Sequence, residues 1–296
     1  MNFKKFNLPA KKERLPIDGL RDIVNLIRQD LKFKYLPFKL YYRYRAKKYA
    51  KYISPELNLI KFLANKNKVS IDIGANLGLF TFYLQKYSKY VYAFEPNPYP
   101  LRNLKNLVNK NTEVIPIAIG NKDGYWDLFI PKNKKGWSSN GASLKERELN
   151  LGIKHNVVSR KIDSLEINNV GLIKIDVEGF EKEVLEGASK TIKDFKPNII
   201  IENEWIHQRN PNDLFDNILG LGYEIFYVNS ELKLEKINKK FNIIEAQKNP
   251  NQKKKGYIQN FICIHKENIT QYMSIILWFI LEGCKSKKSA SNLMIV

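Results

Sequence analysis

The chain has 296 residues, 44% of them hydrophobic, and a formal net charge of +20. This length allows one sizeable hydrophobic core, so we expect one main domain at residues 54–268. A basic extension, residues 1–53, precedes it, and an apolar and basic tail, residues 269–296, follows it. With two cysteines, three histidines and no CxxC motif, the sequence excludes a disulfide framework and does not support a structural zinc site.

The positive charge implies attraction to an anionic partner, namely nucleic acid, a membrane surface or a phosphorylated carrier. A lysine-rich, solvated surface without such a partner explains the charge equally well. Residues 1–14 are basic and lack the apolar core of a secretory signal. We therefore expect a cytoplasmic protein, with peripheral contact to an anionic membrane as an additional hypothesis.

Helices are predicted ahead of the first strand. Apolar residues recur at helical spacing over residues 17–31, which indicates an amphipathic helix. In residues 39–49 tyrosines are interspersed with lysines and arginines. This pattern can stack on bases or sugars or lie at a membrane interface, but more often it packs its rings on the domain. Ser54, Pro55 and Glu56 then predict the capped start of a helix that runs to Leu63.

A nucleotide-binding βαβ unit is predicted at residues 69–95. Apolar residues alternate over residues 69–73, glycines interrupt the sequence DIGANLG at residues 72–78, and an apolar-periodic helix follows at residues 79–87. A second strand at residues 90–94 leads directly to Glu95. A carboxylate at this position can accept hydrogen bonds from both hydroxyl groups of a cofactor ribose.

The glycine spacing distinguishes between two cofactors. A dinucleotide fold would have the pattern GxGxxG, whereas this turn has one glycine fewer. A carboxylate at Asp72 would also repel a pyrophosphate but would suit the cationic amino-acid end of S-adenosylmethionine, which we therefore prefer to NAD. The predicted cofactor-binding residues are Asp72, Gly74, Asn76, Gly78, Glu95, Asn97 and Ala118.

The remaining elements alternate between strands and helices, which predicts an α/β fold with a mostly parallel sheet and an antiparallel closing strand. Strands are predicted at residues 113–119, 126–130, 157–162, 172–177, 198–202, 224–228 and 260–264, and helices at residues 98–111, 180–195 and 214–221. The loop at residues 131–142 is a candidate acceptor-binding flap. The apolar residues 269–281 fall short of the roughly 20 that a membrane span needs, so they form either a packed terminal helix or an interfacial anchor.

Three motifs together resemble the FkbM family of S-adenosylmethionine-dependent O-methyltransferases. They are DIGANLG at residues 72–78, AFEPNP at residues 93–98 and IKIDVEGFE at residues 173–181, and the resemblance covers roughly residues 68–204. It implies a Rossmann-like class I methyltransferase fold and acceptors such as sugar or polyketide hydroxyls. Within that range we expect a sugar of a surface glycan or a lipid-linked saccharide, because the basic and apolar ends suit a membrane-borne anionic substrate.

Acidic residues follow several predicted strands and would meet at the carboxyl edge of the sheet. Methyl transfer to oxygen needs a base near the acceptor hydroxyl, and the predicted catalytic residues are Asp176, Glu178 and His207. Asp176 is equally well explained as a ligand of the methionine part of the cofactor, Glu178 as an acid at a helix start, and His207 as a non-catalytic histidine.

Glu202 and Glu204 are further candidate bases, and Asp176, Glu202 and Asn203 offer oxygen ligands for a divalent ion. Acids at strand ends are common in this fold, so no metal is assigned. Two other functions compete with sugar methylation. An RNA methyltransferase agrees with the charge, although nucleic acid is an unlikely partner because no RNA-binding module is recognisable. A non-catalytic basic membrane adaptor would require the loss of cofactor binding.

Overall fold

The computed structural model describes residues 38–133, 136–137, 141–144, 152–207, 210–238, 241–248 and 257–272. The helix predicted at residues 17–31 and all but the first four residues of the apolar stretch 269–281 lie outside these ranges. Within them, no helix has the length and apolar character needed to cross a membrane. The predicted domain boundaries at residues 54 and 268 stay predictions.

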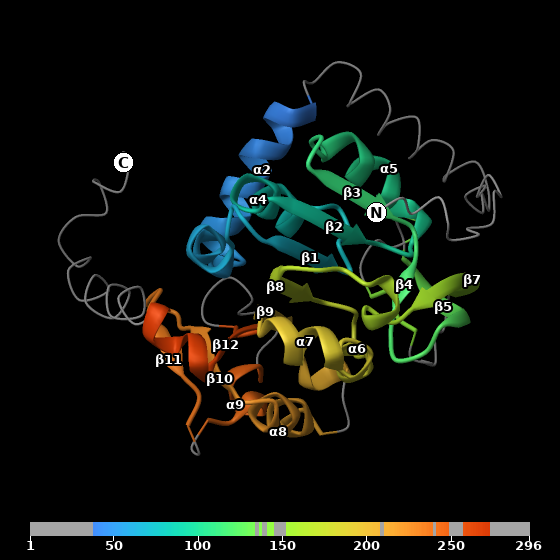
Figure 1. The fold of residues 1–296 in the computed structure, drawn as a ribbon. Helices are drawn as coiled ribbons and strands as arrows, with labels where there is room; N and C mark the ends of the chain where they lie inside the picture. The colour runs from blue at the N-terminus through green and yellow to red at the C-terminus, as the bar shows by residue number, and fades with distance from the viewer. Residues whose placement is uncertain are drawn as a thin grey trace.

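An eight-stranded sheet forms the centre of the protein (Figure 1). In spatial order its strands are β11 (Leu234–Lys236), β10 (Tyr223–Val228), β12 (Asn260–His265), β9 (Asn198–Glu202), β8 (Val170–Ile175), β1 (Val69–Ile73), β2 (Tyr90–Phe94) and β3 (Thr112–Ile115). The pairs from β9 to β3 are parallel, whereas β12 runs antiparallel to both of its neighbours. This order confirms the predicted Rossmann-like class I methyltransferase fold with its antiparallel closing strand.

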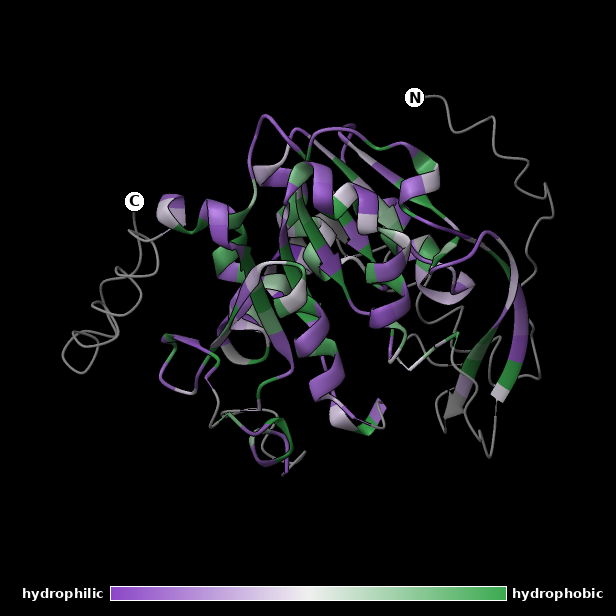
Figure 2. Cartoon of the chain, turned by 60° about the horizontal axis from the view of Figure 1, so that its bottom comes forward, coloured by the Kyte–Doolittle hydropathy of each residue, from purple (hydrophilic) through white to green (hydrophobic). Residues whose placement is uncertain are grey.

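Helices cover both faces of this sheet, because its parallel strands are apolar on both sides. The helices α6 (Glu181–Gly187), α7 (Ser189–Phe195) and α8 (Asn212–Gly220) share one hydrophobic cluster with the sheet. The helices α2 (Phe38–Tyr52), α3 (Ile60–Leu63) and α4 (Leu79–Tyr87), with the 3-10 helix η2 (Pro55–Leu59), lie on the opposite side, as does α5 (Pro98–Leu107). Neighbouring residues Leu172 and Ile173 of β8 point into different clusters, as the pleat of a strand requires. Figure 2 shows the resulting apolar centre, with hydrophilic residues on the outer sides of the helices.

A second, four-stranded sheet outside the main one carries part of the functional site. Their strand order is β4 (Ala118–Ile119), β7 (Gly152–Arg160), β5 (Gly124–Asn133) and β6 (Gly136–Trp137). The antiparallel strands β5 and β7 project from the domain in Figure 1. The single strand predicted at residues 113–119 is wrong: it divides at Pro116, which has no N–H to donate, and its two parts join different sheets.

Other predicted elements differ in detail. The helix predicted at residues 180–195 is two helices, which meet where Gly187 packs so closely that a Cβ would lie 1.9 Å from the carbonyl oxygen of Gly120. The helix predicted at residues 98–111 ends at Leu107. A helical segment begins at Pro55 and ends at Leu63 as predicted, but Ser54 makes no side-chain capping hydrogen bond, so the predicted cap is wrong. The short elements β11 and α9 (Ile243–Ala246), and the 3-10 helices η3 (Asp163–Leu165), η4 (Trp205–His207) and η6 (Lys266–Asn268), were not predicted.

The aromatic and basic stretch forms helix α2, which packs against α4 and α5. Tyr42 is buried and donates a hydrogen bond to the carbonyl oxygen of Leu77, and Ala46 and Ala50 are buried on the same side. Tyr44, in contrast, is 67% exposed. The packing hypothesis therefore holds for Tyr42, while the outer face of the helix is open to solvent.

Candidate functional site

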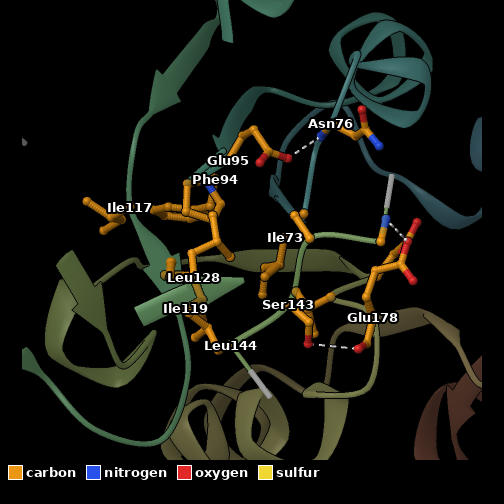
Figure 3. Close-up of a pocket in the computed structure, with 17 residues that line it drawn as sticks. Ile73, Asn76, Phe94, Glu95, Ile117, Ile119, Leu128, Ser143, Leu144 and Glu178 are labelled. Atoms are coloured by element: carbon orange, nitrogen blue, oxygen red, sulfur yellow. Dashed lines mark hydrogen bonds between the residues drawn. The ribbon is translucent and has the colours of Figure 1, made fainter. Parts of the chain in front are cut away.

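A cavity opens at the carboxyl ends of β1, β2 and β8 (Figure 3). Its empty volume, including the part open to solvent, is about 560 Å³. Such an edge is where open α/β sheets bind their ligands. Six of the ten predicted site residues line the cavity, namely Gly74, Asn76, Glu95, Ala118, Asp176 and Glu178.

The cavity has an apolar side and a polar side. Figure 3 shows the apolar side chains of Phe94, Ile117, Ile119, Leu128 and Leu144 gathered on one side of the pocket. The polar residues Asn76, Glu95 and Glu178 lie around the rest of it. This division suits a ligand with one flat apolar ring system and one hydroxylated or charged end.

The turn after β1 brings the cavity wall together through two glycines. Gly74 has a φ of +74°, and a Cβ at this position would lie 1.8 Å from the backbone oxygen of Asp176. Gly78 has a φ of +83°, and a Cβ there would lie 2.6 Å from Leu104 and 2.7 Å from Leu107. Gly74 thus allows β1 to approach β8, whereas Gly78, outside the cavity lining, allows the start of α4 to pack on α5.

Glu95 links the two loops at the ends of β1 and β2. Its Oε2 accepts a hydrogen bond of 2.6 Å from the backbone N–H of Asn76, and its Oε1 accepts one of 2.7 Å from that of Asn97. Burial raises the pKa of Glu95 to about 7, against the effect of these two hydrogen bonds. Asn97 does not line the cavity, because its side chain caps α5 by accepting a hydrogen bond from the N–H of Tyr99.

Asp72 lies behind the cavity wall rather than in it. It is fully buried, accepts a hydrogen bond from Thr81 Oγ1 and lies 3.8 Å from Lys174 Nζ. Lys174 Nζ also donates to Asp176 Oδ2 at 3.0 Å and to the carbonyl oxygen of Gly74 at 3.1 Å. Burial works to lower the pKa of Lys174, but Asp176 and Asp72 together hold it above its ordinary value. The expected direct contact between Asp72 and a cationic cofactor is therefore replaced by a buried ion pair with Lys174.

Glu178 and His207 meet beside the cavity. Glu178 has a φ of +58°, a sparsely populated conformation for a non-glycine residue. Its Oε1 accepts a hydrogen bond of 2.8 Å from the N–H of Gly141, and its Oε2 lies 3.3 Å from His207 Nε2. Glu204 Oε2 lies 3.8 Å from the same nitrogen. Two of the predicted catalytic residues thus form one pair. Glu178 lies in the loop after β8, and His207 lies in the segment after the neighbouring strand β9.

Carboxylates crowd around this pair. Burial raises the pKa of Glu202 well above its ordinary value, and the nearby Asp176, Glu178 and Glu204 raise it further. Burial likewise raises the pKa of Tyr257, which hydrogen-bonds Glu204. A concentration of acids in a chain with a net charge of +20 marks this edge of the sheet as chemically distinct from the average surface.

The predicted flap contributes part of the cavity wall. Gly141, Ala142, Ser143 and Leu144 line the cavity, and Ser143 Oγ donates a hydrogen bond of 2.9 Å to the carbonyl oxygen of Glu178. Residues 138–140 of the predicted flap lie outside the described ranges. Sequence reasoning missed Ser143 and Leu144, as well as Lys174, whose charge in an otherwise apolar strand was the available signal.

S-adenosylmethionine fits the residues that are present. The apolar side can cover an adenine ring, Glu95 retains acceptor capacity beside its two backbone partners, and Asp176 supplies negative charge for a cationic methionine end. The close approach at Gly74 leaves no room for a side chain between the strand ends.

Comparisons with known proteins identify the family of the chain. A sequence profile of the methyltransferase FkbM domain matches residues 72–225, more than half of the chain. The hexuronic acid methyltransferase AglP of Haloferax volcanii is 28% identical over 142 residues, which is 47% of this chain and 58% of that protein. A tRNA(Phe) (4-demethylwyosine(37)-C(7)) aminocarboxypropyltransferase of Methanocaldococcus jannaschii is 43% identical over 74 residues, which is 23% of this chain and 29% of that protein.

A crystal structure of the methyltransferase FkbM from Methylobacillus flagellatus KT superimposes with a TM-score of 0.42 at 16% identity. The match covers 68% of this chain and 44% of that one. The chain thus spans less than two thirds of the length of each of these relatives. From the extent of the FkbM profile match, the chain belongs to the methyltransferase FkbM family, and its cofactor is S-adenosylmethionine.

Proposed function

We propose that the protein transfers a methyl group from S-adenosylmethionine to a hydroxyl group of a sugar, in a surface glycan or a lipid-linked saccharide. The observation that carries the proposal is the pair formed by Glu178, which lines the cavity, and His207, with 3.3 Å between Oε2 and Nε2. An alcohol is a weak acid, so a base at this position meets the main requirement of O-methylation. The similarity to AglP, which is named for a hexuronic acid, favours a sugar acceptor.

In this proposal the cofactor lies along the cavity from its apolar side to its acidic side. Ala118 and Phe94 contact the adenine, and Glu95 accepts hydrogen bonds from the ribose hydroxyls. Gly74 and Asn76 border the methionine part, whose ammonium group Asp176 binds. Asp72, Gly78 and Asn97 support these residues from behind the wall: Asp72 holds Lys174, Gly78 starts α4, and Asn97 holds Glu95.

The chain's own residues position the acceptor and accept its proton. S-adenosylmethionine supplies an activated methyl group, so no covalent intermediate with the protein is needed. The imidazole of His207 takes the proton of the acceptor hydroxyl, and Glu178 and Glu204, whose carboxylates lie 3.3 Å and 3.8 Å from Nε2, stabilise the imidazolium that results. The hydroxyl oxygen then attacks the methyl carbon in line with the sulfur.

The basic face of α2 supports peripheral contact with an anionic membrane, where a lipid-linked acceptor would be available. Arg43, Lys47, Lys48 and Lys51 are exposed on this helix. Burial lowers the pKa of the neighbouring Lys86, and the charges of Arg43 and Lys47 lower it further, so the cations are crowded. Sedimentation with vesicles that contain anionic lipid tests this contact, which raised salt should weaken.

The experiment that tests the function compares the wild type with His207→Gln and with Asp216→Asn, an exposed acid on α8. Radiolabelled S-adenosylmethionine is offered with neutral oligosaccharides, uronic-acid oligosaccharides and tRNA, and alkaline treatment of the product separates a stable methyl ether from a labile methyl ester. We expect ether formation on a saccharide, a loss of about 10²- to 10⁴-fold in kcat for His207→Gln, and unchanged affinity for S-adenosylhomocysteine. A methyl ester, or full activity in His207→Gln, would contradict the proposal.

RNA methylation is the second candidate, favoured by the 43% identity to the tRNA-modifying enzyme over 74 residues. The acids at positions 176, 178, 202 and 204 count against it, because they would repel the phosphates of an RNA next to the methyl group. Salt-dependent binding of tRNA together with label in the tRNA arm would favour this alternative. The adaptor hypothesis would gain support only if freshly purified, cofactor-free protein failed to bind S-adenosylhomocysteine.

A further inference from the structure

Three side chains with metal-binding chemistry converge beside the cofactor cavity. Glu178 follows β8, Glu202 is the last residue of β9, and His207 ends η4. One ligand atom from each lies within 4.8 Å of the others, and His207 Nε2 lies 3.3 Å from Glu178 Oε2. Metal–ligand distances of about 2.0–2.2 Å allow two ligands of one ion to be at most about 4.4 Å apart. Small side-chain rotations would therefore bring all three into one coordination shell.

Glu202 is surrounded by other acidic side chains, an environment that a bound cation would stabilise. Glu202 is only 8% exposed. Its side chain forms a hydrogen bond with the carboxyl group of Asp176, which is another acid. Glu178 and Glu204 add two more negative charges nearby. Lys174 lies on the other side of Asp176, which it binds at 3.0 Å, and is also paired with Asp72. Four carboxyl groups, those of Asp176, Glu178, Glu202 and Glu204, therefore lie close together around the side chain of Glu202.

Adjacent residues hold the three ligands in place independently of any metal. Gly141 donates to Oε1 of Glu178, which leaves Oε2 directed at His207. The start of η4 is fixed because Gln247 accepts a hydrogen bond from the N–H of Trp205. Glu202 is held by the ladder between β9 and β12, where it pairs with Asn260. The cluster is thus anchored on three separate elements.

We propose that Glu178, Glu202 and His207 bind one divalent first-row transition-metal ion. A set of one imidazole and two carboxylates suits Mn²⁺ or Zn²⁺ better than Ca²⁺, which takes oxygen ligands alone. Three protein ligands leave coordination positions free, as in catalytic rather than structural sites. This set differs from Asp176, Glu202 and Asn203, because Asn203 Nδ2 instead donates to the carbonyl oxygen of Pro211.

The ion's part in catalysis rests on the proposed function, whereas its binding does not. A sugar hydroxyl on a free coordination position would become more acidic and would lose its proton to Glu204 or to water. The oxygen would then form a bond to the methyl carbon as the carbon–sulfur bond breaks, and the sulfonium would leave as the neutral thioether of S-adenosylhomocysteine. In a metal-loaded enzyme His207 would be a ligand and could not also act as the base, so Glu204 or water would accept the proton in its place.

Binding of Mn²⁺ to the chelator-treated full chain tests the proposal, because the electron paramagnetic resonance signal of free Mn²⁺ decreases on binding. We expect one ion per chain, displaced by Zn²⁺, with affinity reduced at least tenfold in Glu202→Gln and in His207→Gln but unchanged in Asp216→Asn. His207→Gln guards against misfolding, since residue 207 lies outside the sheet. No binding, or equal affinity in folded His207→Gln and the wild type, would overturn the metal site.

Calorimetric titration with S-adenosylhomocysteine, in chelator and without added metal, tests cofactor binding independently of metal binding. It therefore distinguishes failure of the metal site from failure of the proposed function. Cofactor binding without Mn²⁺ binding would overturn the metal site alone. Mn²⁺ binding without cofactor binding would leave the metal site standing and remove the proposed methyl transfer.

Discussion

Replacing Glu95 by glutamine tests how the cofactor cavity recognises its ligand. The change keeps the side-chain shape but turns one of two acceptor oxygens into a donor. At present those oxygens accept from Asn76 N at 2.6 Å and Asn97 N at 2.7 Å. If Glu95 also accepts from the ribose, the variant loses at least one hydrogen bond to a charged acceptor, worth about 1.5–3 kcal/mol. We therefore expect affinity for S-adenosylhomocysteine to fall roughly 10- to 150-fold at pH 8.

The same substitution should not unfold the protein. Burial raises the pKa of Glu95 from 4.5 to about 7, which corresponds to roughly 3 kcal/mol spent on ionising the group in the folded state. Glutamine removes this cost but leaves one backbone N–H facing an amide, so the two effects oppose each other. The free energy of unfolding at pH 8 should therefore stay equal to that of the wild type or rise by at most about 3 kcal/mol.

The pH dependence supplies a second measurement. In the folded state Glu95 holds its proton up to about pH 7, whereas in the unfolded state it releases the proton near its ordinary value of 4.5. Its contribution to stability therefore falls as the pH rises through this window. Because the ionised form binds the ribose, wild-type affinity should be about tenfold weaker at pH 6 than at pH 8.

Titration calorimetry at pH 6 and pH 8, with thermal unfolding at both, would check these expectations, with Asp216→Asn as an exposed-acid control. The affinity of Glu95→Gln should be the same at both pH values. Equal affinity of the variant and the wild type at pH 8 would refute the assigned ribose contact.

Three further substitutions probe the scaffold. Gly74→Ala should destabilise the protein by about 2–5 kcal/mol, because the backbone there is left-handed and the new Cβ would lie 1.8 Å from a backbone oxygen. Gly220→Ala is the control: no atom lies within 4 Å of a Cβ at that position, so its melting temperature should change little. A melting temperature equal to that of the wild type in Gly74→Ala would contradict the packing argument. Lys174→Met should lower the free energy of unfolding by about 3–5 kcal/mol, measured with denaturant, because the buried Asp72 loses the cation beside it. Adding Asp72→Asn to the same chain should recover part of this loss. Burial raises the pKa of Glu56 to about 8, so its contribution to stability falls between about pH 4.5 and pH 8, and Glu56→Gln should raise the melting temperature more at pH 8.5 than at pH 5. An equal effect at both pH values would show that Glu56 is not the titrating group.

The βαβ unit could be predicted from the sequence because its signals are local. Alternation of apolar residues, the glycine turn and helical periodicity all lie within 26 residues, and the structure places β1, α4 and β2 at the predicted bounds. The strand at residues 198–202 is equally local and equally well predicted. Elements whose signals lie within one segment of the chain could therefore be predicted from the sequence.

The partners of Asp72 could not be predicted in the same way. Asp72 lies opposite Lys174 in the register between β1 and β8, and 102 residues separate the two in the chain. No local pattern specifies that register, so the carboxylate was expected to face the ligand. The proximity of Glu178 to His207 is another product of strand order, because it depends on β9 lying beside β8.

The division at Pro116 also determines how the cavity is built mechanically. One wall belongs to the main sheet, and the other belongs to the strands that begin at β4, so the two walls are hydrogen-bonded as separate units. A tilt of one sheet against the other would widen the entrance of the cavity without breaking a strand-to-strand hydrogen bond within either sheet. It would break the hydrogen bonds that Gly141 and Ser143 make to Glu178. Glu178 therefore links the two walls of the cavity through these two hydrogen bonds.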